Sequence, residues 1–152
     1  HRVDAPMGAR HQLTFNAEPV SGGTWAPNGE LMYRSDTGGN EHRQIFSLTR
    51  GQLTDSQGRW GGITFHPDGG SFATTNNLRN GTDTDVVWVD AETLEVQPLT
   101  EKEGAWWPVD WSPSGEELLV SRYVSVNESE LWLVDVEAER EEEASRGCEG
   151  NR

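Results

Sequence analysis

Two stretches of the sequence carry residues of the kinds used in nucleophilic catalysis. Residues 69–73, Gly-Gly-Ser-Phe-Ala, come close to the Gly-x-Ser-x-Gly nucleophile elbow, which needs a buried strand before the serine and a helix after it. Here Ser71 follows a Pro-Asp-Gly turn and opens an expected strand, so we interpret the match as a coincidence. His66 lies two residues before Asp68 but has no serine in an elbow beside it, and we assign both to the same turn.

Residues 80–85, Asn-Gly-Thr-Asp-Thr-Asp, have oxygen-bearing side chains at a spacing typical of calcium loops. An EF-hand requires glycine at its sixth position and glutamate at its twelfth. Counting from Asn80, those positions hold Asp85 and Ala91, so we interpret this stretch as a solvated hairpin tip. The four histidines show no convergent spacing either. The sequence therefore predicts no catalytic, cofactor-binding or metal-binding residues in this chain.

Two further features could serve binding. The pair Trp106 and Trp107 could form a stacking platform, but aromatic residues on inner strands of stacked sheets more often pack between the sheets, which is what we expect here. Arg122 and Tyr123 precede a polar connection that we expect to form an elaborated loop as far as Glu128. A loop on a rigid scaffold could contact another domain or merely cap the sheet, and the sequence leaves both open.

The elements that must position these residues repeat three times. Leu13, Leu53 and Leu99 each lie 14 residues before a turn proline, and the repeat is 40 residues long the first time and 46 the second. Each leucine belongs to a triplet ending in threonine, and each turn leads into short alternating or apolar runs typical of strands. In the first unit we expect strands near 23–26, 31–35, 43–48 and 51–54, with residues 12–15 as the last strand of an earlier unit.

The turns themselves are predicted by their residue types. Proline fixes φ at the first central position of a turn, and glycine accepts a positive φ further on, so the chain reverses without strain. We therefore assign structural turn roles to seven residues: Pro27, Gly29, Pro67, Asp68, Gly69, Pro113 and Gly115.

About four strands per unit and a period of 40–46 residues are typical of β-propeller blades. The predicted fold is all-β: a partial β-propeller of about three four-stranded antiparallel blades. We expect the end of a preceding blade and a loop at 1–19, blades at 20–54 and 58–100, an incomplete blade at 105–135, and an acidic tail at 136–152. That tail could form a short helix, but its run of glutamates favours disorder. Because propellers close with 4–8 blades, we expect a segment of a larger propeller or a chain that associates to complete one.

The composition limits the partners. The 12 basic and 26 acidic residues give a net charge of −14, so nucleic acid and anionic membranes are poor partners. Lys102 is the single lysine, which suits either a halophile or a genome that favours arginine codons. Cys148 is the single cysteine, so no intrachain disulfide is possible. The absence of a long apolar run predicts no membrane span. The chain opens in mid-pattern with His1, as a piece of a longer protein would, and the compartment stays open: cytoplasmic or exported, bacterial or archaeal.

Residues 107–135 resemble the N-terminal propeller of the prolyl oligopeptidase family of serine peptidases, in particular its dipeptidyl- and acylaminoacyl-peptidase-like members. The resemblance rests on Asp110-Trp111-Ser112-Pro113-x-Gly115, on 118–120, on 123–129 and on Leu131-Trp132-Leu133-Val134-Asp135. The Leu-Thr triplets and the turn at 66–69 are also similar to TolB-like propeller repeats. Asn28 and Ser114 depart from the Pro-Asp-Gly turn of these repeats.

The resemblance implies a propeller that filters peptides on their way to a C-terminal α/β-hydrolase domain, which would hold the catalytic residues. No family catalytic residue can be placed on this sequence. We therefore expect a non-catalytic propeller segment of such a peptidase, with the remaining blades and the hydrolase domain as its partners and no cofactor. The alternative is a TolB-like scaffold for protein–protein interaction. A sugar- or metal-dependent propeller enzyme is a weaker third hypothesis, because it needs convergent carboxylates or histidines.

Overall fold

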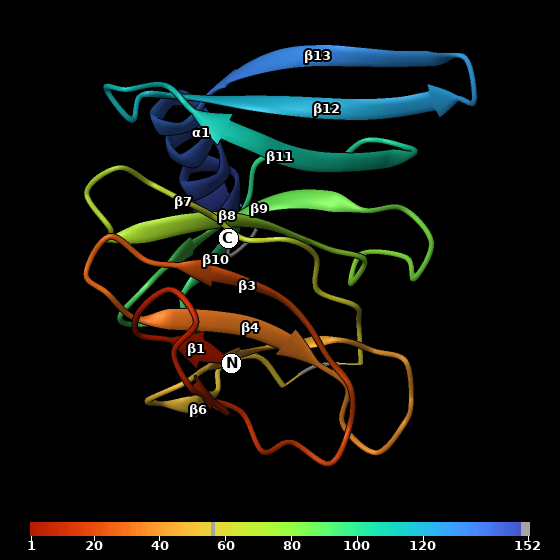
Figure 1. Cartoon of the computed structure of the whole chain (residues 1–152). Helices are drawn as coiled ribbons and strands as arrows, with labels where there is room; N and C mark the ends of the chain where they lie inside the picture. The colour runs from red at the N-terminus through yellow and green to blue at the C-terminus, as the bar shows by residue number, and fades with distance from the viewer. Residues whose placement is uncertain (56, 150–152) are drawn as a thin grey trace.

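The computed structural model of the chain describes the backbone of residues 1–55 and 57–149 and the side chains of residues 1–55 and 57–142. Within this part, the strands form successive antiparallel sheets followed by one C-terminal helix. Figure 1 shows the sheets stacked in chain order, from the red N-terminal end to the blue C-terminal end. This is the arrangement of consecutive propeller blades, and it confirms the predicted all-β partial propeller.

The strands of each blade follow one another in space as they do in sequence. The first blade has the order β3 (Val20–Trp25), β4 (Leu31–Ser35), β5 (Gln44–Ser47) and β6 (Gly51–Gln52). The second has β7 (Thr64–Phe65), β8 (Ser71–Asn76), β9 (Asp85–Asp90) and β10 (Val96–Pro98). The third has only three strands in the described part, β11 (Ala105–Trp111), β12 (Glu117–Ser125) and β13 (Glu128–Asp135). A small ribbon of β1 (Arg2–Val3) and β2 (Arg10–His11) precedes them.

The Leu-Thr triplets close the outer edge of the first two blades in the same way. Leu53 donates its backbone N–H to the carbonyl of Ile45 over 2.8 Å, and Ile45 donates its own N–H to the Thr54 hydroxyl over 2.9 Å. In the second blade Val86 forms the equivalent pair with Leu99 and Thr100, at 2.8 and 2.9 Å. The outer strand leaves the sheet at this point and offers no backbone acceptor. The threonine hydroxyl takes its place, so the N–H of the buried third strand keeps a hydrogen-bond partner.

The core lies between the blades. One apolar cluster joins the first and second blades, and its buried members include Met32, Ile45 and Phe72. A second cluster joins the second and third blades, and it includes Trp88, Trp106 and Leu118 among its buried members. Each blade therefore depends on its neighbour for burial, as repeat architectures do.

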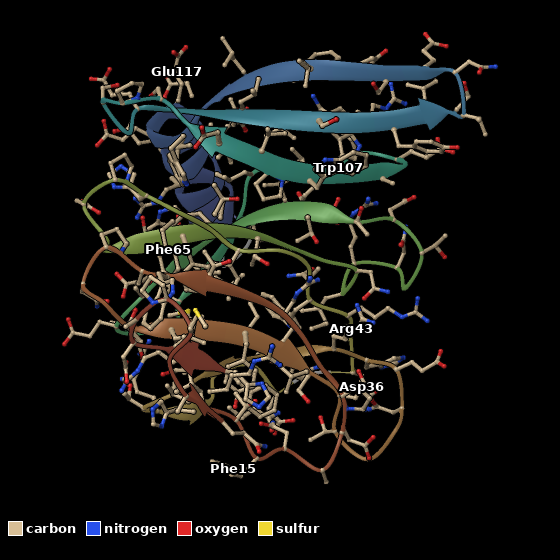
Figure 2. All side chains as sticks on the ribbon, viewed as in Figure 1. Phe15, Asp36, Arg43, Phe65, Trp107 and Glu117 are labelled. Atoms are coloured by element: carbon tan, nitrogen blue, oxygen red, sulfur yellow. The ribbon has the colours of Figure 1, made fainter. Side chains whose placement is uncertain are left out.

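The two terminal faces of the stack are less covered. Phe15 is 80% exposed beside the first blade, and Leu131 and Leu133 of the third blade are 69% and 66% exposed. Figure 2 shows Phe15 at the N-terminal end of the stack and Trp107, which is 40% exposed, on the C-terminal blade.

Two expectations about strands were wrong. Residues 12–15 form no strand, and β2 ends at His11. The residues that follow pair with no strand in the described part of the chain, so no ladder continues through them. Conversely, the expected loop after Arg122 is an extension of the sheet, in which Tyr123 pairs with Ser129 and Ser125 with Glu128. The β-forming residues of this stretch continue the ladder almost to the hairpin tip.

The preference for a disordered tail was also wrong, because residues 136–149 form helix α1 (Val136–Glu149). Asp135 caps it by accepting a hydrogen bond from the N–H of Ala138 over 3.0 Å, and acidic residues in the first turn suit the helix dipole. Val136 is buried in the second apolar cluster. Arg140 lies 3.7 Å above the Trp88 ring and donates to Gln97 over 2.9 Å, so it anchors the helix to the second blade.

The last part of the predicted tail, residues 150–152, and the side chain of Cys148 lie outside the described residues. Among the described residues, no helix combines the length and the apolar character needed to cross a membrane.

Candidate functional site

The turn residues singled out in the sequence lie in equivalent hairpins of the three blades. In each hairpin a glycine donates its N–H to the carbonyl three residues earlier over 2.9 Å: Gly29 to Ala26, Gly69 to His66, and Gly115 to Ser112. Their φ angles are +86°, +76° and +81°, values that residues with a side chain rarely adopt. The proline occupies the first central position of each turn, as its fixed φ favours.

These turns also contact one another across the blades. A Cβ atom on Gly69 would lie 3.3 Å from Pro27, and one on Gly115 would lie only 2.0 Å from His66 Nε2. The ring of His66 packs edge-on against Trp111 with centroids 4.9 Å apart, and its Nε2 lies 3.2 Å from the Gly115 carbonyl. The rim that bears the turns is therefore a packed seam.

His66 and Asp68 are brought together, but in this seam rather than at a nucleophile. His66 Nδ1 lies 2.6 Å from Asp68 Oδ1, and Asp68 also accepts the N–H of Gly70 over 2.7 Å. The Gly70 hydrogen bond, followed by the contact with His66, lowers the pKa of Asp68. Ser71 begins strand β8 and not a helix, so the local geometry is not that of a nucleophile elbow.

Two other turn carboxylates have a lowered pKa. Asp90 accepts the N–H groups of Thr93 and Glu92 over 2.7 and 2.9 Å, and these bonds favour its ionised form. Asp83 accepts the N–H of Gly104 over 2.9 Å, which lowers its pKa in the same way. The folded state therefore binds protons at these aspartates less readily than the unfolded chain does.

The protein should consequently be less stable at acid pH. A carboxylate whose pKa is lower in the folded state stabilises the fold above its unfolded pKa, and that contribution is lost as the pH falls through the folded value. We expect the free energy of unfolding to decrease as the pH is lowered from about 5 to about 3. Urea titrations of the wild type and of Asp90→Asn measure this, because the amide oxygen still accepts the hydrogen bonds but does not titrate. Equal slopes of stability against pH in the two proteins would contradict the assignment.

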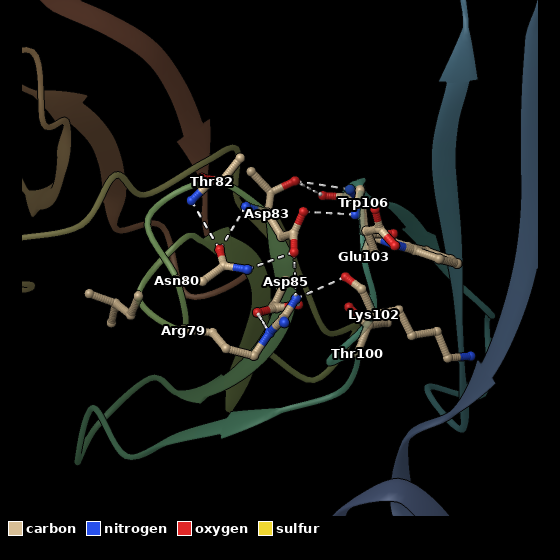
Figure 3. Close-up of polar contacts among 12 residues, drawn as sticks. Arg79, Asn80, Thr82, Asp83, Asp85, Thr100, Lys102, Glu103 and Trp106 are labelled. Carbon is tan, nitrogen blue, oxygen red and sulfur yellow. Dashed lines mark hydrogen bonds and ion pairs between the residues drawn. The ribbon is translucent and has the colours of Figure 1, made fainter.

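The calcium-like loop is organised around Arg79 (Figure 3). Arg79 donates to both oxygens of Asp85 over 2.8 and 3.0 Å, to Asp83 over 3.3 Å and to the carbonyl of Lys102 over 2.9 Å. Asn80 donates to the same oxygen of Asp83 over 2.7 Å. The carboxylates thus converge on a guanidinium group. In the described part of the chain, no group of three or more acidic, histidine or cysteine side chains is placed to hold a metal ion.

This loop fastens the second blade to the start of the third. Thr84 exchanges hydrogen bonds with the backbone of Trp106 over 2.9 and 3.1 Å, beside the bond from Gly104 to Asp83. Asp85 is buried at 4% exposure, so its charge depends on Arg79 for compensation.

Removing one partner of this ion pair should cost more than removing both charges. We expect Arg79→Gln to lower the urea midpoint clearly, because it leaves the buried Asp85 carboxylate without its cation. The double variant Arg79→Gln with Asp85→Asn should recover part of the loss. A double-mutant cycle measured by urea unfolding checks this, and strictly additive effects would contradict the coupling.

A further arrangement suited to binding lies where Lys102 meets the third blade. Trp106 is 3% exposed and Trp132 is 43% exposed, and their rings meet edge-on with centroids 5.8 Å apart. Lys102 Nζ lies 5.7 Å from the first ring and 5.1 Å from the second, and Arg122 lies 5.3 Å from Trp106 on β11. We call these four residues together with Glu130 the aromatic–cation cluster.

Glu130 completes the cluster from the neighbouring strand position. It accepts the indole N–H of Trp132 over 3.0 Å and a guanidinium N–H of Arg122 over 3.3 Å. These two hydrogen bonds lower its pKa and keep it ionised. A hollow of about 320 Å³ adjoins the cluster, and Lys102, Trp106 and Trp132 line it together with the end of β10. Aromatic faces beside fixed charges and a hollow are suited to binding.

The sequence singled out only part of this cluster. The expectation that both tryptophans pack between the blades was right for Trp106, which is 3% exposed, and wrong for Trp107, which is 40% exposed. Lys102, Glu130 and Trp132 were missed as site residues. The register of β12 against β13 sets Arg122 opposite Glu130 and Val120 opposite Trp132, and so brings Glu130 and Trp132 to the cluster.

Comparison with known proteins agrees with the fold. No protein-family model matches the sequence, and no curated protein sequence does. Among solved structures, the chain is similar to TolB from Acinetobacter baumannii, with a TM-score of 0.63 and 21% identity over 78% of this chain and 30% of that one. It is also similar to a putative TolB from Agrobacterium tumefaciens, with a TM-score of 0.54 and 19% identity over 80% of this chain and 60% of that one.

The fold is a TolB-like β-propeller. The chain spans about a third and three fifths of the lengths of these two structures, so it corresponds to a part of each. At such low identity the likeness concerns the fold, and function has to be argued from the site.

Proposed function

We propose that this chain is a non-catalytic propeller segment of a serine peptidase of the prolyl oligopeptidase family, and that it controls the access of peptides to a hydrolase domain. The observation that carries the proposal is the aromatic–cation cluster beside its hollow. An extended peptide offers carbonyl groups to cations, N–H groups to a carboxylate and apolar side chains to indole rings. The residues that resemble the peptidase family, 107–135, supply three of the five cluster residues.

The cluster gives a direct binding test. We expect the chain to bind an unstructured peptide weakly, and Trp132→Ala to reduce that affinity about tenfold, the effect of losing somewhat more than 1 kcal/mol at an interface. Trp107→Ala is the matched control, because Trp107 is almost equally exposed but lies outside the hollow. Fluorescence anisotropy of a labelled peptide measures the affinity of both variants. An equal loss of affinity in the two would show that the cluster does not bind the peptide.

The peptidase assignment has its own test in the gene. The reading frame after this segment should encode about 200–250 residues, the size of one further domain, containing Gly-x-Ser-x-Gly, then an aspartate and then a histidine. A serine-directed fluorophosphonate probe should label that longer polypeptide and leave the 152 residues unlabelled. A stop codon after further blades only, with no such triad, would exclude the assignment.

A second candidate function is a TolB-like scaffold for protein–protein interaction, and the similarity of fold to two TolB structures favours it. Under this hypothesis the precursor carries an export signal and no hydrolase domain. The same cluster would then bind a segment of a partner protein. A reading frame with a signal peptide and no triad would favour this function over the first.

A further inference from the structure

The outer edge of the third blade is open at a defined position. β13 is the last strand of its sheet in the described part of the chain, with β12 on its other side. Leu131 lies opposite Ser121, just as Ile45 lies opposite Arg34 and Val86 opposite Thr75. Each of these residues follows a polar residue of its strand: Gln44, Asp85 and Glu130.

In the first two blades this position has a specific occupant. Ile45 and Val86 each bond to a Leu-Thr pair through both backbone groups. The leucine N–H donates to their carbonyl, and their own N–H donates to the threonine hydroxyl. By the same register, the N–H and carbonyl of Leu131 point away from β12, toward the open edge.

As far as Glu149, where the described residues end, the chain after β13 does not return to this edge. After Asp135 the chain enters α1. Its Val136 is buried in the second apolar cluster, and its Arg140 packs on Trp88 and donates to Gln97 of the second blade. The chain nevertheless holds a third Leu-Thr triplet, Gln12-Leu13-Thr14, with no strand beside it in the described part. It shares one local contact with the triplet of the first blade: Gln12 donates to the carbonyl of Thr14 over 2.7 Å, as Gln52 donates to that of Thr54 over 2.8 Å.

We propose that Gln12-Leu13-Thr14 of a second copy of this chain completes the third blade. The Leu13 N–H donates to the carbonyl of Leu131, and the Leu131 N–H donates to the Thr14 hydroxyl. The register of the first two blades, in which Gln52 faces Phe46 and Pro98 faces Val87, sets Gln12 opposite Trp132. The same register sets His11 and Arg10 of strand β2 opposite Leu133 and Val134, so β2 continues the new outer strand.

Charge favours a second copy as the occupant. Residues 1–11 carry two arginines, two histidines and one aspartate, which makes them a basic end in a chain of net charge −14. Residues 128–142 carry seven acidic side chains and one arginine. The added strand therefore brings basic groups to an acidic edge, which steers association.

Exposed apolar side chains on the first and third blades also favour the pairing of two copies. Leu131 and Leu133 on the outer face of the third blade are 69% and 66% exposed, while Trp25 and Phe15 at the first blade are 59% and 80% exposed. Joining the third blade of one copy to the first blade of the next covers both faces. Two copies then make two identical junctions and about six blades, within the range of closed propellers.

Cysteine pairs test the register. In a Cys148→Ser background, Leu13→Cys combined with Leu131→Cys should oxidise to a covalent species of twice the 16.9 kDa of one chain, since directly opposite residues in neighbouring strands are close enough for a disulfide. Leu13→Cys combined with Val126→Cys is the matched control, because Val126 is 90% exposed at the far tip of the hairpin, and it should stay mostly uncoupled. Efficient coupling of the control, or none in the test pair, overturns the register.

Sedimentation of the unmodified 152-residue chain tests the association itself. We expect a two-copy particle at tens of micromolar, and Thr14→Val, which keeps the side-chain shape but loses the hydroxyl acceptor, should raise its dissociation constant at least severalfold. Thr82→Val, in an exposed loop, should leave it unchanged. Leu131→Pro, checked for folding by circular dichroism, should give single copies. A single-copy wild type overturns this proposal. The proposed peptide-binding function is decided separately, by the anisotropy measurement on Trp132→Ala.

Discussion

Replacement of Phe72 by alanine is expected to lower the free energy of unfolding by about 3–5 kcal/mol, the cost of removing a large buried aromatic side chain. Phe72 is 1% exposed and packs edge-on against Phe65, with centroids 5.6 Å apart. It lies in the cluster that joins the first blade to the second. The cavity would open between two blades, so the loss should reach both of them.

Urea unfolding followed by tryptophan fluorescence measures this effect. Phe15→Ala is the matched control, since the same side chain is removed from a site that is 80% exposed, and it should change stability by less than about 0.5 kcal/mol. Similar effects of the two substitutions would show that the blades do not bury one another as described.

The second large effect is expected at Gly115. Gly115→Ala combines two costs: a left-handed backbone with φ of +81°, and a Cβ atom 2.0 Å from His66 Nε2. The backbone cost is about 1–2 kcal/mol, and forcing the His66 ring away from Trp111 adds about 1–3 kcal/mol. The substitution should therefore loosen the second blade from the third.

Gly29→Ala separates the two costs. Gly29 has almost the same φ, +86°, at the same place in its turn, but an added Cβ would meet nothing within 4 Å. Its substitution should show the backbone cost alone. If the two variants are equally destabilised, the seam between the turns contributes nothing to stability.

Much of the fold follows from the sequence because its signals are local and repeated. A proline and a glycine in each turn and a leucine 14 residues before each proline predict the hairpins and the outer strands without knowledge of distant contacts. The elements that were missed depend on distant partners. Helix α1 is held by Arg140 on Trp88, 52 positions earlier, and residues 12–15 stay outside a sheet because no strand of the described chain pairs with them.

The candidate site was less predictable for the same reason. Lys102, Trp106 and Trp132 come together only once the third blade has folded against the second, and nothing in their spacing predicts contact. The loop at 80–85 shows the converse case. Its composition suggested a cation site, and the cation it holds is the guanidinium of Arg79, a neighbour in sequence.

The packed seam of turns has a consequence for protein engineering. Each blade has two ends, and the end with the proline turns is locked through Gly69 against Pro27 and Gly115 against His66. At the opposite end the loop around Arg79 fastens the second blade to the third, whereas the connections at 36–43 and at Val126 and Asn127 lie mostly in solvent. Foreign peptides, such as epitopes or tags, should be tolerated when grafted into those two connections and not at the turns.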